Sequence, residues 1–258
     1  MALSNIADLD SIEIDKKLLI DLLVTLYSDE PELITLLNFD TETMSTSEFV
    51  FKLNTLTRKI VSNVELFLGI KSTILKGYNL DNTIINPVEA DFEVYTANML
   101  KDVYDNMGLI YIVESRYSIL AGLLYKVNAV FDKIRSFDPK ETNITISEII
   151  NNTYVKNNWN FKAIKSFTFD VNTKQHTWTA WSNTHQRLTA PIVETPDTII
   201  NIHCDTTVNF KKWYNSIPNN KKVVMMGSNT KPVYMNKVLV YDKLESDNQS
   251  RWLKIGYK

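Results

Sequence analysis

The spacing of the hydrophobic residues changes part-way along this chain of 258 residues. Up to about residue 155, apolar positions recur at steps of three and four, which is typical of amphipathic helices. From residue 156 onward, short segments alternate between apolar and polar residues, and turn-forming sequences separate them. The sequence therefore predicts an α+β fold. An acidic N-terminal long-helix bundle or hairpin (1–155) would precede a basic C-terminal antiparallel β-sandwich or small β-barrel (156–258).

The strongest helical pattern covers residues 88–136, and a second long helix is expected over 47–76. The apolar residues of the first segment form a seam that repeats about every seven residues, as in coiled coils. Its phase slips once beside Gly108, so two interpretations stay open: a continuous rod, or an ordinary bundle whose long helix breaks there. The predicted assembly seam consists of Ile110, Val113, Tyr117, Leu120, Leu124, Val127, Phe131 and Ile134.

The charge divides along the same line as the spacing. Residues 1–150 contain 13 Lys and Arg against 23 Asp and Glu, and the remainder contains 15 against 7, giving −10 and +8 within a total of −2. Electrostatic fields of opposite sign steer association, so the acidic part of one copy could bind the basic part of the next copy. The alternative is that each part has an unevenly charged, solvated surface.

The sequence contains no recognisable catalytic or ligand-binding motif. His203, Cys204 and Asp205 are metal-ligand types, but a strand would turn Cys204 away from the other two, and no second ligand pair exists. Their adjacency does not make a nucleophile–base pair either, since those groups must meet in space. Glu194 and Asp197 lie in a predicted loop and are weak candidates for paired catalytic carboxylates. No glycine-rich phosphate loop is present. We therefore expect no catalytic, cofactor-binding or metal-binding residues.

Aromatic and basic residues gather in the C-terminal part and offer a possible ligand or partner surface. Aromatic rings can stack on sugars or bases, although tryptophan also often fills the core of a small β-domain. A glycan or host receptor is a possible partner, and nucleic acid is not expected. The residues concerned are Trp178, Trp181, Arg187, Lys211, Lys212 and Trp213.

The chain is expected to be made in a cytoplasm. Its start has no basic segment followed by an apolar one, so no secretory signal is predicted. The most apolar stretch, 109–130, is interrupted by Glu114, Arg116 and Lys126, which argues against a membrane span. Insertion of the helical hairpin into membranes, as in a toxin, is a lesser interpretation.

These features favour a non-enzymatic structural or assembly protein. The best match is a virion component, such as a phage tail, collar (connector) or baseplate subunit. It would form a symmetric homo-oligomeric ring through its helices and contact other structural proteins through its β module. The alternative is a receptor- or glycan-binding protein that uses the aromatic face of the β module.

Overall fold

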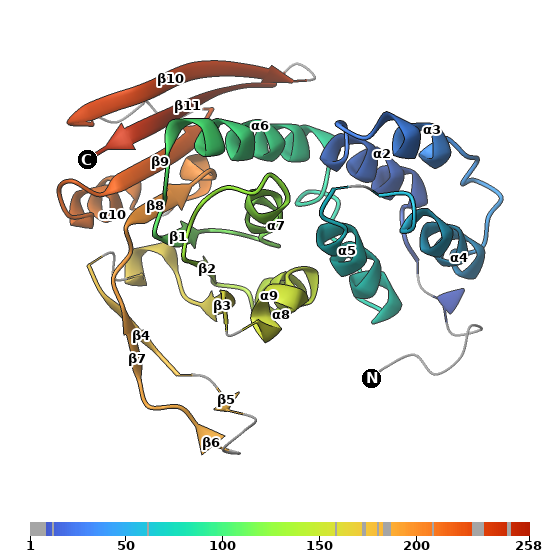
Figure 1. Ribbon diagram of the computed structural model, residues 1–258, viewed down its shortest axis with the longest axis horizontal. Coiled ribbons are helices and arrows are strands. Elements are labelled where there is room, and N and C mark those ends of the chain that lie inside the picture. The colour runs from blue at the N-terminus through green and yellow to red at the C-terminus, as the bar shows by residue number, and fades with distance from the viewer. Residues whose placement is uncertain are drawn as a thin grey trace.

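A seven-stranded sheet joins the two parts of the chain in the computed structural model (Figure 1). The structure describes residues 9–11, 13–60, 62–157, 159–171, 174–179, 181–182, 187–207, 209–228, 235–246 and 249–258. The sheet contains β1 (Leu109–Val113), β2 (Lys133–Asp138), β3 (Phe161–Lys165), β8 (Thr198–Asn201), β9 (Lys222–Gly227), β10 (Lys237–Ser246) and β11 (Gln249–Tyr257).

The order of the strands is β10-β11-β9-β8-β1-β2-β3. Strand β1 pairs in parallel with β2 on one side and with β8 on the other, and the parallel pairing continues from β2 to β3 and from β8 to β9. The strand β11 lies antiparallel between β9 and β10. This is a mostly parallel, Rossmann-like α/β sheet, with β1 near its middle.

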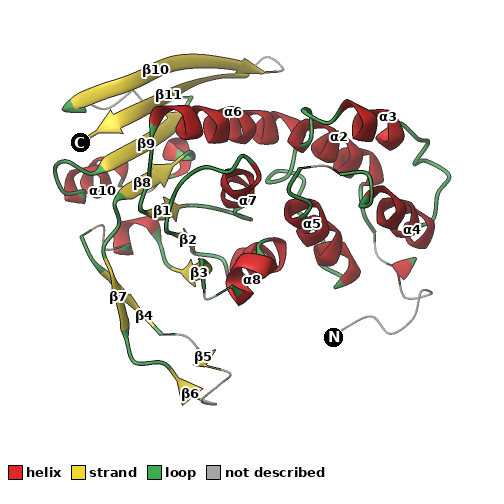
Figure 2. Ribbon diagram, viewed as in Figure 1, coloured by secondary structure: helices red, strands yellow, loops and turns green. Residues whose placement is uncertain are grey.

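Helices cover both faces of the sheet (Figure 2). The helices α6, α7 and α8 pack on one face together with the N-terminal helices, and α10 packs on the other. The helices are α2 (Lys16–Leu26), α3 (Pro31–Leu37), α4 (Thr46–Leu56), α5 (Glu65–Leu75), α6 (Pro87–Val103), α7 (Ile119–Lys126), α8 (Glu141–Ile150), α9 (Asn152–Lys156) and α10 (Phe210–Ser216), with 3₁₀ turns η1 (Thr168–Asp170) and η2 (Cys204–Thr206).

Side-chain oxygens define where several helices begin. Ser45 and Glu48 form a reciprocal capping box at α4. The Asn86 side chain accepts from the Glu89 N–H at the start of α6, and Pro87 occupies the first turn, where a missing N–H costs nothing. The Asn86 cap fixes where α6 begins, and this places the acidic residues of the helix toward one end of the sheet.

Two short ribbons lie between β3 and β8 and extend away from the sheet (Figure 1). One pairs β4 (His176–Trp178) with β7 (Ile192–Glu194), and the other pairs β5 (Trp181–Ser182) with β6 (Arg187–Leu188). The buried Arg135 of β2 fastens the first ribbon through two 2.6 Å bonds to Glu194. Trp178 donates to the same carboxylate at 2.8 Å.

The expected helix over 88–136 is wrong, because that segment forms α6, β1, α7 and β2 in succession. The expected helix over 47–76 is likewise two helices, α4 and α5. The antiparallel sandwich or barrel is also wrong, since strands on both sides of residue 155 share one mostly parallel sheet. The prediction of an α+β fold is therefore corrected to α/β.

The residues of the predicted seam belong to the interior of a single chain. Ile110 and Val113 lie in β1, Leu120 and Leu124 in α7, and Ile134 in β2, all of them buried. Tyr117 is buried in the loop between β1 and α7, while Val127 and Phe131 are partly buried against the same core. A strand buried on both faces is apolar at every position. Its residues therefore continued the three-and-four spacing of the apolar residues in the neighbouring helices.

None of the helices within the described ranges is long and apolar enough to cross a membrane.

Candidate active site

The carboxyl ends of β1, β2 and β8 meet at the point where the sheet changes its direction of growth. From β1 the chain first builds outward through β2 and β3, and then returns to the other edge of β1 with β8. In open α/β sheets such a switch point opens a crevice beyond the carboxyl ends of the strands, and ligands bind there. The residues after these three strands are therefore the first candidates for a functional site.

The loop from β1 to α7 has an unusual backbone. Glu114, Arg116 and Ser118 have φ angles of 52°, 51° and 56°, in the left-handed region. Residues other than glycine rarely adopt this backbone conformation. Those that do are often found at functional sites, where the surrounding structure stabilises them. Glycine would normally occupy such positions, so a search for glycine motifs could not find this loop.

Polar contacts from β2 and α8 hold the loop in place. Asp138, the last residue of β2, accepts from the Arg116 N–H at 3.0 Å and from the Lys140 N–H at 2.9 Å. The Asn143 side chain donates to the same carboxyl at 2.9 Å. Burial raises the pKa of Asp138, although these donors oppose the shift. Ser118 hydrogen-bonds to Ser136 and Ser147 beneath the loop.

Glu114 is held by hydroxyl groups that follow two other strands. Its carboxylate accepts from Thr168 at 2.7 Å and from Thr206 at 2.6 Å. Since Thr168 comes after β3 and Thr206 after β8, Glu114 ties both sides of the switch point to the end of β1.

Charged side chains from four elements converge at this end of the sheet. Glu89 of α6 accepts both terminal nitrogens of Arg251 from β11. The Arg116 guanidinium lies 3.5 Å from Glu89, within ion-pair range. The His203 ring, just after β8, lies 4.0 Å from the same carboxylate. Glu93, one helical turn beyond Glu89, is also buried.

Three buried atoms of this group have no hydrogen-bond partner in the part of the chain that the structure describes. They are Glu93 Oε2, Arg116 Nη1 and His203 Nε2. Buried polar atoms are nearly always paired, because an unpaired one costs about 1–3 kcal/mol. The carboxyl, guanidinium and imidazole together therefore form a set of donors and acceptors suited to a polar ligand.

Burial controls the charges of this group. It raises the pKa of Glu93 to about 8, with a smaller contribution from the Glu89 carboxylate. It also lowers the pKa of His203 well below 6.5, and both arginines act in the same direction. Near pH 7, then, Glu93 and the imidazole of His203 are both neutral in this cluster.

The residues singled out for chemistry in the sequence do not assemble into a site. Cys204 is buried, which raises the pKa of its thiol, and its Sγ donates to the Asn201 carbonyl at 3.3 Å. Asp205 accepts instead from the backbone and hydroxyl of Ser228. Glu194 binds Arg135, whereas Asp197 accepts from the Leu109 N–H at 3.0 Å. Only His203 belongs to the switch-point cluster.

The predicted aromatic and basic surface does not form one face. Trp178 and Trp213 are buried, so neither can line an exposed groove. Lys211 and Lys212 lie on the exposed side of α10, around an open hollow of about 600 Å³. The side chains of Trp181 and Arg187 lie outside the described residues.

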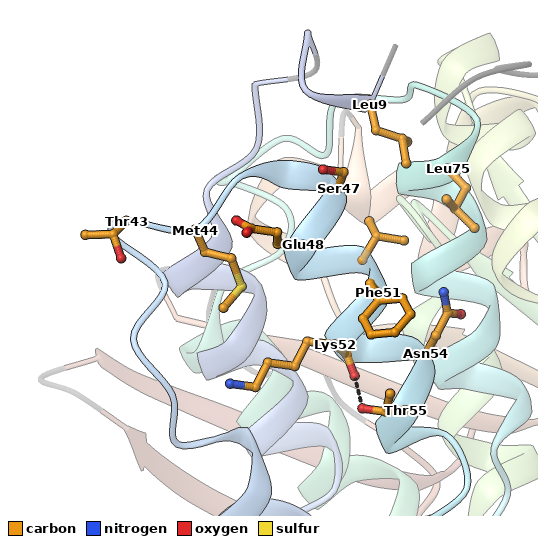
Figure 3. A pocket seen from close by; sticks show the side chains of 11 residues that line it. Leu9, Thr43, Met44, Ser47, Glu48, Phe51, Lys52, Asn54, Thr55 and Leu75 are labelled. Carbon is orange, nitrogen blue, oxygen red and sulfur yellow. Dashed lines mark hydrogen bonds between the residues drawn. The ribbon is translucent and has the colours of Figure 1, made fainter. Parts of the chain in front are cut away.

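A larger hollow lies on the N-terminal helices (Figure 3). This open, mainly apolar groove of about 860 Å³ runs beside α4, and its lining includes Met44, Phe51 and Leu75. Phe51 is 71% exposed. The groove shares no lining residue with the switch-point cluster, and its exposed surface is mainly apolar although Glu48, Lys52 and Asn54 also line it.

Sequence reasoning missed Glu89, Glu93, Asp138 and Arg251, and it misread Arg116. The sequence signal for this site was the presence of charged residues within segments expected to have an apolar face. Glu89 and Glu93 are four residues apart, which puts two acids on one side of a helix. Arg116 interrupts the most apolar stretch of the chain, and it counted only as an argument against a membrane span.

Comparisons with known proteins agree with the Rossmann-like sheet. No family model and no curated protein matches the sequence. Among solved structures, the chain is similar to the tRNA methyltransferase TrmK of Bacillus subtilis (7% identity, TM-score 0.41, covering 63% of this chain and 64% of that one). It is also similar to the Mycoplasma capricolum TrmK in complex with S-adenosylhomocysteine (10%, 0.42, 63% and 67%). A third is the N-methyltransferase NodS of Bradyrhizobium japonicum (9%, 0.44, 68% and 98%). At these identities the likeness concerns the fold.

The expectation of a non-enzymatic virion component, whether tail, collar or baseplate subunit, is wrong. It depended on a helical seam between subunits, and that seam is the core of one chain. The solved structures named above are methyltransferases, and the expectation of a chain without enzymatic activity is withdrawn. The receptor- or glycan-binding alternative loses two of its three tryptophans, since Trp178 and Trp213 are buried, and a glycan or receptor partner stays a prediction.

Proposed function

We propose that this chain is an enzyme that transfers a methyl group from S-adenosylmethionine, with its active site at the carboxyl ends of β1 and β8. The observation that carries the proposal is the cluster at the switch point, where buried polar atoms without partners meet the left-handed loop after β1. Open α/β sheets bind nucleoside-type ligands at this position.

Glu93 argues against dinucleotides and other phosphorylated ligands. A Rossmann site for a dinucleotide binds the pyrophosphate at the N-terminus of the helix after β1. Here the first turn of that helix, α7, is next to Glu93, whose carboxyl interacts with the Leu120 N–H. A carboxyl group in this place competes with a phosphate and repels it when ionised. S-adenosylmethionine has no phosphate, and its sulfonium and ammonium groups are cationic.

The residues present fit the amino-acid end of this cofactor. Arg116 Nη1 makes no hydrogen bond within the described residues, although it lies 3.5 Å from Glu89, and it could donate to a carboxylate. Glu89 and Glu93 supply acceptors for an ammonium group. At the ribose end, Asp138 accepts three hydrogen bonds from the chain itself. A carboxylate offers about four acceptor positions, so one remains for a ligand hydroxyl.

The bound cofactor would supply an electrophilic methyl group. The chain's own contribution is to bind and orient: Arg116 and Glu89 fix the charged end, and the loop after β1 sets the position of the nucleoside. The neutral ring of His203 presents Nε2 as a hydrogen-bonding position for the methyl acceptor. Exact placement of the acceptor is worth far more to the rate than a single hydrogen bond.

Isothermal titration calorimetry tests this proposal directly. S-adenosylmethionine and S-adenosylhomocysteine should bind with a stoichiometry near one, whereas NADH should not bind. Arg116→Ala should weaken adenosyl binding by about tenfold or more, because a charge-assisted contact is lost. Lys212→Ala, which removes an exposed charge from α10, serves as the matched control. No binding of either adenosyl compound by the folded wild-type protein would refute the proposal.

A further inference from the structure

Glu93 has no counter-ion of its own, unlike the acid one turn before it. Glu89 is paired with Arg251 and has Arg116 within 3.5 Å. Among the residues that the structure describes, Glu93 Oε2 has no hydrogen-bond partner, and Glu93 is 9% exposed. A buried carboxyl that interacts with a single backbone N–H favours its neutral form, because a buried charge without a counter-ion is very costly.

The groups that face Glu93 come from every element packed around it. Glu89 on its own helix repels an ionised Glu93, while Arg116 from the β1 loop and Arg251 from β11 favour ionisation. The Leu120 N–H of α7 also favours the ionised form. His203, beyond β8, is neutral and contributes no charge. Because Glu89 already engages both arginines, a further positive charge is needed to ionise Glu93 near pH 7.

We infer that Glu93 is a specificity-determining residue that selects ligands with a positively charged nitrogen or sulfur centre. In the empty site its carboxyl group holds a proton. A cationic ligand displaces that proton and pairs with the carboxylate, so binding releases one proton to the solvent. A neutral ligand of the same shape gains no ion pair and leaves the proton in place. This inference rests on the proposed function, since it assigns the cation to a ligand at the same site.

Calorimetry in two buffers measures this proton. At pH 7, S-adenosylhomocysteine, which carries an ammonium group, is titrated into the wild-type protein in phosphate and in Tris. These buffers take up a proton with very different enthalpies. The observed heats should differ by the amount that corresponds to about one released proton per bound ligand.

Glu93→Gln keeps the shape of the neutral side chain and should fold normally. It should bind S-adenosylhomocysteine about tenfold or more weakly, and with equal heats in both buffers apart from the ligand's own ionisation. Asp91→Asn, an exposed change on the same helix, should behave like the wild type. Adenosine, which lacks the ammonium group, should release no proton from any of the three proteins.

The outcomes separate the two proposals. Binding of S-adenosylhomocysteine without proton release, or equal release by Glu93→Gln, overturns the role of Glu93 and leaves the proposed function standing. No binding at all overturns both. A ligand-free measurement adds an independent arm: the infrared band of a protonated carboxyl at pH 7 should be present in the wild type and missing in Glu93→Gln. Identical spectra would also overturn the inference.

Discussion

At the scale of single residues, the cluster beyond β1 and β8 contains groups whose charges depend on burial. Glu93 and His203 are both neutral near pH 7, but for opposite reasons: one retains its proton and the other has lost it. In the unfolded chain Glu93 would be ionised at this pH, and His203 would take up a proton below about pH 6.5. Folding therefore changes the number of bound protons, which makes stability depend on pH.

The two residues affect stability in opposite directions. The folded pKa of Glu93 is raised from 4.5 to about 8, so between these values the folded state holds a proton that the unfolded state lacks. Its stabilising contribution is complete below about pH 4.5 and is lost as the pH rises toward 8. His203 has a lowered pKa, so its contribution is present above about pH 6.5 and is lost as the pH falls below it.

Glu93→Gln should flatten the alkaline part of this profile. Between pH 5.5 and 7.5, the free energy of unfolding of the wild type minus that of the variant should fall by up to about 1.4 kcal/mol per pH unit, the slope for one proton. Urea titrations at several pH values measure this difference, and His203 cancels in the subtraction. A difference that stays level across this range would contradict a protonated Glu93.

At the scale of elements, part of the structure could be predicted and part could not. Residues 16–26 and 31–37 have the apolar spacing of short helices, and the structure has α2 and α3 there. These helices have one buried face, so their apolar residues recur at the helical period. The pattern of β1 is different, because Ile110, Tyr111 and Ile112 are each at most 1% exposed.

A strand buried on both faces leaves no alternation to recognise. The apolar residues of β1, read together with those of α7, had spacings of three and four by coincidence. The β-branched residues of β1 and the turn before Gly108 were the available signals. The assembly of the site could not be predicted, because Glu89, Arg116 and Arg251 are brought together by the order of strands in the sheet. That order depends on contacts between distant parts of the chain.

Leu124 distinguishes an internal core from a seam between subunits. It is completely buried in α7. Leu124→Ala should lower the free energy of unfolding by about 2–5 kcal/mol, because it leaves a cavity. The mass of the native protein in light scattering should not change. Leu36→Ala, at a 42% exposed position of α3, is the control and should have a small effect on stability.

The ribbon of β4 and β7 depends on a buried ion pair. The side chains of Arg135 and Glu194 are 1% and 10% exposed. Glu194→Gln should cost about 3–5 kcal/mol in urea unfolding, because it leaves the guanidinium without a counter-charge. Glu141→Gln removes the partner of the exposed Lys165 and should cost at most about 1 kcal/mol. Equal losses in the two variants would mean that the pair does not anchor the ribbon.

At the scale of the whole molecule, the division of charge does not follow a division of the sheet. The acidic residues 1–150 supply β1 and β2, and the basic remainder supplies the other five strands described in the sheet. A homo-oligomer, expected from the sequence, stays a prediction. Light scattering at low and high salt tests it: a mass above 29.8 kDa that falls with added salt would support association through complementary charge. A mass equal to that of one chain at both salts would contradict it.

The position of β1 also determines how the protein can form during its synthesis. When β1 leaves the ribosome, the helices that precede it are complete, and β2 follows within about twenty residues. The opposite edge of β1 stays unpaired until β8 emerges, beginning at Thr198. Nascent chains with an open strand edge are prone to pair with one another. The antiparallel pair of β10 and β11 adds a second constraint. Strand β11 is made after β10, yet it lies between β10 and β9 in the sheet. The sheet therefore cannot be completed strand by strand as the chain appears, and β10 can join it only after β11 has been made.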